Sequence, residues 1–158
     1  MIDRALRDKA AVLIRRLGDG MITSDEFEDE WPRPSDDRAL KAIAATLWGA
    51  YSDISSHKLE GSYALNEYGR ALFDRCILFL ESDLEYAWPR NRLYGEKGIP
   101  LTIVVLSLGM LFPLYLMQKR HYVEQEAAGD RHAWPFIRRL DYEREHAHAA
   151  ERSNWLGP

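Results

Sequence analysis

The chain has little cysteine: Cys76 is its only one, so no disulfide can form within the chain. This suits a reducing compartment, where thiols stay reduced. Cys76 lies in the apolar stretch RCILFL. We expect its thiol to be buried there, because a reactive thiolate needs an exposed and electropositive surrounding. The N-terminal residues also lack the apolar core of a signal peptide, since charge begins at Asp3.

The sequence also lacks the features of several common function classes. Its net charge of −4 gives no overall positive field, so we expect no nucleic-acid partner. It contains neither a phosphate-binding glycine loop nor the Gly-x-Ser-x-Gly motif of hydrolases. We therefore expect a chain without a cofactor, and more readily a binding protein than an enzyme.

No segment shows the alternating apolar pattern of a strand, so the chain is predicted to be all-α. Its 158 residues suit a small helical bundle of about five to six helices, one of them a long apolar helix or hairpin. Three parts are expected: an N-terminal helical region, an apolar segment, and a C-terminal helical tail that packs with the first region. These parts cover residues 1–98, 99–117 and 118–158.

Helix boundaries can be read from capping signals. Thr23 and Glu26 have the spacing of a capping box and predict a short acidic helix that ends before the following prolines. Ser35 is predicted to cap the next helix, whose apolar stripe includes Trp48. Phe73 lies on a further helical stripe, and we expect Trp48 and Phe73 to lie in the core. Trp-Pro occurs three times and is typical of a tryptophan packed beside a helix boundary.

Negative charge is concentrated in residues 19–37, which carry eight acidic side chains and one basic side chain. The rest of the chain is balanced or basic, so this segment holds nearly all of the asymmetry. It is either a solvated surface or a docking surface for a partner protein with a basic surface. The residues that we expect to bind such a partner are Asp25, Glu26, Glu28, Asp29 and Glu30.

Part of the same segment resembles half of a calcium-binding EF-hand loop. Alignment of its glycine puts Asp19 and Glu26 at ligand positions, but Arg15 and Leu17 then occupy the first two. Calcium takes six to eight oxygen ligands, and neither an arginine nor a leucine side chain supplies one. We expect no calcium site.

Residues 99–117 contain no charged side chain and are long enough to cross a bilayer as a helix. Basic residues and tyrosines flank them on both sides, as they flank many membrane segments. Pro100, Gly109 and Pro113 weaken a single straight helix. A transmembrane helix, a membrane hairpin and a buried core helix all remain open, so a membrane is included among the expected partners.

The C-terminal part offers one alternative chemistry. Glu143 and His146 have the Glu-x-x-His spacing of di-iron bundles, although no second such unit follows. Glu145, His148 and Glu151 share one face of the predicted helix. The alternative to a binding protein is therefore a metal-dependent enzyme that uses these side chains.

The stretches MITSDEFEDEWP, YSD, RCILFLESDLEYAWP and AWPFIRRLDYE together resemble a family of small bacterial proteins that share a domain of unknown function. The resemblance carries no activity over. It implies that residues 1–98 and 130–145 form one unit, which disfavours a single membrane crossing between them. It also implies the bacterial cytoplasm or the cytoplasmic face of the inner membrane. The expected function is an accessory, adaptor or immunity-like binding protein.

Overall fold

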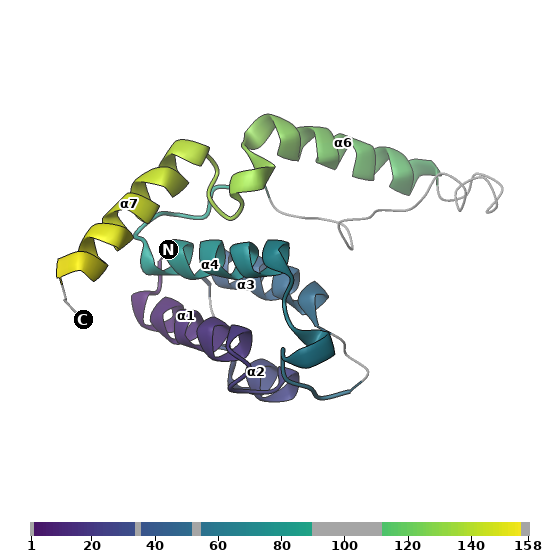
Figure 1. Cartoon of the computed structure of the whole chain (residues 1–158). Helices are drawn as coiled ribbons and strands as arrows, with labels where there is room; N and C mark the ends of the chain where they lie inside the picture. Colours follow the sequence, from purple (N-terminus) through teal and green to yellow (C-terminus); the bar gives the residue numbers. More distant parts are fainter. Residues whose placement is uncertain (1, 34–35, 52–54, 90–111, 156–158) are drawn as a thin grey trace.

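The computed structural model describes residues 2–33, 36–51, 55–89 and 112–155. Within these ranges the chain is helical and has no β-strand, which confirms the all-α class (Figure 1). Short 3-10 turns connect several of the α-helices. The elements are α1 (Arg4–Gly18), α2 (Ser24–Glu30), α3 (Arg38–Leu47), η1 (Trp48–Ala50), η2 (Gly61–Tyr63), α4 (Glu67–Glu81), α6 (Phe112–Ala128), η3 (Arg131–Ala133) and α7 (Arg139–Trp155).

The centre of the fold is the antiparallel pair formed by α1 and α4, which lie side by side in Figure 1. Both helices turn an apolar face inward, and their buried side chains join one core with residues of α2 and α3. Phe73 and Cys76 are buried in this core, as their positions in the sequence predicted. Full burial of a leucine, isoleucine or phenylalanine contributes roughly 1.5–3 kcal/mol, so this pair supplies much of the apolar stabilisation.

The connection from α1 to α2 follows the capping signals closely. Gly20 has a φ of 67°, and the amides of Gly20 and Met21 donate to the carbonyls of Leu17 and Arg16, which is the Schellman end of a helix. Two residues later the Thr23–Glu26 capping box is formed, which confirms that prediction. Glycine suits the left-handed position because it has no Cβ to clash.

Helix α3 differs from the expectation at both ends. Asp37 rather than Ser35 is its N-cap: the Asp37 carboxylate accepts from the amide of Ala39, while Ser35 lies outside the described residues. At the other end, α3 stops at Leu47, and a 3-10 turn begins at Trp48. The side chain of Trp48 is 54% exposed, so its placement in the core was wrong.

The C-terminal elements pack against the helical bundle. Phe136, fully buried, packs edge-on against Phe79 of α4, with ring centroids 5.1 Å apart. The indole of Trp88 donates to the carbonyls of Pro135 and Phe136, at 3.0 and 3.2 Å. The second and third Trp-Pro pairs thus meet at this junction, which joins α7 to α4.

Most of the predicted apolar segment, residues 99–117, lies outside the described residues, which resume at Phe112. Its last residues form the first turns of α6, and Figure 1 shows this helix standing apart from the bundle of α1 to α4. Among the described helices, none combines the length and the apolar character that a bilayer crossing requires. The division of the chain into three parts stays a prediction.

Candidate functional site

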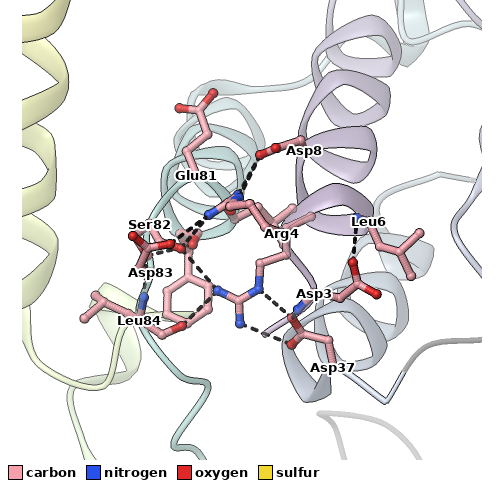
Figure 2. Close-up of polar contacts among 12 residues, drawn as sticks. Asp3, Arg4, Leu6, Asp8, Asp37, Glu81, Ser82, Asp83 and Leu84 are labelled. Carbon is pink, nitrogen blue, oxygen red and sulfur yellow. Dashed lines mark hydrogen bonds and ion pairs between the residues drawn. The ribbon is translucent and has the colours of Figure 1, made fainter. Parts of the chain in front are cut away.

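A buried ion pair lies where α1, α3 and α4 meet (Figure 2). Arg7 of α1 donates through Nε and one terminal nitrogen to the two carboxylate oxygens of Asp37, at 2.6 and 3.1 Å. Its other terminal nitrogen donates to the carbonyls of Ser82 and Leu84, just beyond α4. Both charged side chains are almost fully buried, at 1% and 3% exposure. Such a pair is stable only when hydrogen bonds satisfy both partners, as they do here.

Arg4 reinforces the same junction from a half-exposed position. Its guanidinium donates to the carbonyls of Leu80 and Ser82, and it also pairs with Asp8 one turn along α1 (Figure 2). The carbonyls at the end of a helix carry partial negative charge, so Arg4 and Arg7 together stabilise the C-terminal end of α4.

The ionisation of Asp37 follows from this surrounding. Burial by itself raises the pKa of Asp37, but the hydrogen bonds from Arg7 and from the amides of Ala39 and Asp3 outweigh it and hold the pKa below its ordinary value. Within the described residues, no buried side-chain nitrogen or oxygen lacks a hydrogen-bond partner. The junction is therefore saturated and acts as a structural tie. In the sequence, this ion pair is indicated by a basic residue, Arg7, on the apolar stripe of α1.

Helix α2 carries the acidic surface, which we define as Asp25, Glu26, Glu28, Asp29 and Glu30. One side of the helix is anchored: Phe27 is buried, and its ring lies 5.1 Å from that of Trp31 and 6.0 Å from that of Tyr51. The acids occupy the remaining sides and are exposed, except Glu28, which is half-buried. The anchored face thus holds the five acids of the surface on one short, rigid helix.

Two acids of the acidic surface already have internal partners. Glu26 accepts from the amide and hydroxyl of Thr23, and these hydrogen bonds hold the pKa of Glu26 below its ordinary value. Glu30 pairs with Arg16 of α1 at 3.1 Å. Asp25, Glu28 and Asp29 make no ion pair with any residue that the structure describes. These three carboxylates are therefore the ones best able to pair with a basic side chain of another protein.

Exposed apolar side chains adjoin the acidic surface. Residues 57–60 lie against the start of α2, because the amide of Ser24 donates to the carbonyl of His57 at 2.9 Å and Glu60 lies beside Gly20. The ring of Tyr63, in the turn that follows, lies 4.3 Å from that of His57. Met21 and Tyr63 are 65% and 51% exposed. The sequence analysis singled out neither residue. Met21 lies within the acidic segment 19–37, whereas Tyr63 comes near the start of α2 only through the contact of His57 with Ser24.

A groove of about 460 Å³ lies between α1, α4 and α7. Its floor is apolar and includes Phe73, while Arg70, Asp74 and His146 line its polar parts, and Arg15 and Glu81 pair across one edge. Both basic and acidic side chains line it. The groove therefore presents no concentrated field for a charged substrate.

The Glu and His residues of the alternative metal site are dispersed along α7. Glu143 pairs with Arg139 at 3.1 Å, and His146 lies beside the ring of Tyr142. Over the described part of the chain, no three His, Cys, Asp or Glu side chains are grouped so that they could hold a metal ion. The structure offers no observation that favours the metal-dependent enzyme.

Cys76 is fully buried in the core, and burial raises the pKa of its thiol far above the ordinary value. It is therefore an inert core thiol.

Comparison of the chain with protein-family models, with curated proteins and with solved structures finds no match. The candidate site is the acidic surface of α2, which the charge distribution in the sequence indicates and whose acids the structure places on the outer sides of the helix.

Proposed function

We propose that the chain is a non-catalytic binding protein, of an accessory, adaptor or immunity-like kind, whose acidic surface receives a basic segment of a partner protein. The observation that carries this proposal is the pairing pattern on α2. Asp25, Glu28 and Asp29 lie on an anchored helix without an ion pair among the described residues, while the neighbouring acids are engaged internally.

The physical case combines charge with apolar contact. Negative charge on one face steers a basic partner and raises its association rate, an effect that salt screens beyond about 8 Å. An exposed tyrosine beside such a face supplies contact area of the kind that dominates binding energy, and methionine is also enriched at interfaces. Tyr63 and Met21 offer that area. Because the Schellman turn and the capping box already fix α2, little ordering is needed when a partner binds.

We place this function in bacteria, in the cytoplasm or on the cytoplasmic face of the inner membrane, within the family that the chain resembles. The apolar segment 99–117 belongs to the same proposal as a transmembrane helix, a membrane hairpin or a buried core helix. Its described residues support contact with another body, because Phe112, Leu116 and Met117 are each about half exposed.

The test is affinity capture from the native host, with mild detergent and with three baits compared. The wild type should capture a basic protein, and the Asp25→Asn/Glu28→Gln/Asp29→Asn bait should lose it. A control bait with Glu85→Gln, Glu126→Gln and Glu151→Gln removes the same charge from exposed acids elsewhere in the chain and should retain the partner. The association rate with the purified partner should fall as salt is added.

Two outcomes would contradict the proposal. One is equal capture by the α2 bait and the wild type. The other is equal loss from the α2 bait and the control bait, because total charge rather than this surface would then determine binding. Circular dichroism should show unchanged helix content in both variants, since all the substituted acids lie outside the core.

A further inference from the structure

Exposed large apolar side chains are concentrated on α6. On α1, α4 and α7 such residues are exposed singly, whereas five lie within residues 112–123 of α6. They are between 46% and 57% exposed: Phe112, Leu116, Met117, Tyr122 and Val123. Single exposed apolar residues are normal on a soluble protein, but a contiguous group marks a surface that contacts something else.

The group forms one broad face over the first turns of α6. Phe112 and Met117 are five positions apart, which places them about 140° apart around a helix. Leu116 lies between these two directions, and Pro113 is exposed as well. These four residues therefore lie within one sector of about 140°, a broad apolar face at the first turns of the helix.

After the apolar N-terminal turns of α6, basic side chains come first along the helix and acidic side chains follow. Exposed Lys119 and Arg120 follow Met117 after one intervening residue, and the exposed acids Glu124 and Glu126 come last. Arg120 pairs with Glu124 one turn further on, at 3.2 Å, in a pair that is itself exposed. Residues 112–117 span roughly 9 Å of helix. That length matches the depth of about 5–10 Å to which peripheral segments enter the boundary between lipid headgroups and acyl chains. The bases would then lie at the level of the headgroups, and the acids would remain in water.

The geometry points to a lipid contact: we infer that the apolar end of α6 enters the surface of an anionic bilayer, with Lys119 and Arg120 binding the headgroup phosphates. Figure 1 shows that the Phe112 end of α6 is the end farther from α7 and stands clear of the bundle. At the other end, Arg131 lies over the ring of Tyr122 at 4.7 Å and ties α6 to the following turn. This inference does not depend on the acidic surface, which lies on α2.

The test is flotation of the full chain with vesicles of phosphatidylcholine, with and without phosphatidylglycerol. The wild type should float with the anionic vesicles and much less with phosphatidylcholine alone. Leu116→Glu/Met117→Glu should weaken vesicle binding at least about tenfold, because two apolar side chains leave the lipid. Lys119→Gln/Arg120→Gln should weaken binding roughly thirtyfold on anionic vesicles only.

A matched control is Val12→Glu/Leu140→Glu, which adds two glutamates at exposed apolar positions of α1 and α7. It should bind vesicles like the wild type. Equal loss in this control, unchanged binding by Leu116→Glu/Met117→Glu, or no flotation of the wild type would overturn the inference. So would lipid-free self-association of the wild type that Leu116→Glu/Met117→Glu abolishes, because a second copy would then cover α6. Since the vesicles contain no protein, failure here leaves the proposed partner binding untouched.

Discussion

At the scale of single residues, the ion pair of Arg7 and Asp37 determines how three helices meet. Its burial costs several kcal/mol per ion before compensation. The compensation comes from two hydrogen bonds within the pair and from further bonds to backbone groups around it. The ring of Phe79 lies 5.4 Å from the Arg7 guanidinium and adds a cation–π contact. Loss of either partner would leave the other charge buried and unpaired.

We predict that Arg7→Ala or Asp37→Ala lowers the free energy of unfolding by about 3–5 kcal/mol, the range for removal of one partner of a buried pair. The control is Arg16→Ala, which breaks the largely exposed pair with Glu30 and should cost about 1 kcal/mol or less. Urea denaturation of the three variants measures the difference. Similar losses for Arg7→Ala and Arg16→Ala would show that the buried pair adds little.

The same pair predicts how stability depends on pH. The folded-state pKa of Asp37 lies below its ordinary value of 3.8. A depressed carboxyl pKa contributes stability that is fully present above the unfolded-state pKa and is lost as pH falls through the folded-state pKa. The stability difference between wild type and Asp37→Asn should therefore stay constant near neutral pH and shrink below 3.8. Denaturation curves across the acid range measure it, and a gap that widens in acid would refute the assignment.

At the scale of elements, α2 depends on its caps more than on its length. It has seven residues, too few to be stable alone, so the capping box and the Phe27 anchor hold it. We predict that Thr23→Ala costs about 1 kcal/mol, the usual loss for an N-cap. Glu26→Gln should cost much less, because the amide oxygen of glutamine can still accept from the Thr23 amide. Thermal unfolding followed by circular dichroism separates the two, and an equal loss would mean that charge, rather than capping, holds α2.

Local patterns predicted those elements whose signals are contained within a few residues. The capping box of Thr23, the stripe that buries Phe73 and the core position of Cys76 all belong to this kind. The prediction that Trp48 lies in the core was wrong. Trp48 is about 100° around the helix from Leu47, at the margin of the apolar stripe, and the chain changes there to a 3-10 turn. The N-cap of α3 is Asp37 rather than the predicted Ser35. The Asp37 carboxylate also accepts hydrogen bonds from Arg7, a tertiary contact that no local pattern reveals.

The candidate site was predictable in composition but not in detail. The excess of acids on residues 19–37 is visible in the sequence. Which of them are free depends on contacts with distant elements: Arg16 engages Glu30, and Arg7 withdraws Asp37 into the core. A count of charges therefore overstated the acidic surface that a partner can reach.

At the scale of the whole molecule, the C-terminal residues belong to the same core as the N-terminal helices. Phe136 is fully buried between the rings of Phe79 and Tyr142. The backbone beside it is held from the bundle: Trp88 donates to its carbonyl, and Arg75 of α4 donates to that of Trp134 at 3.1 Å. These contacts join residues that precede the long apolar segment in the sequence to residues that follow it. They predict that α1, α4 and α7 unfold as one cooperative unit.

We predict that Phe136→Ala lowers the free energy of unfolding by about 3–5 kcal/mol, as expected for a buried large aromatic. Leu140→Ala is the control: Leu140 is 70% exposed, so its loss should stay within about 0.5 kcal/mol. Amide hydrogen exchange tests where the loss appears. If the molecule is one unit, Phe136→Ala speeds exchange in α1 and α4 as much as in α7, because all three open together. If exchange rises in α7 alone, the C-terminal helix is a separately docked part, and the ties through Trp88 and Arg75 do not couple it to the bundle.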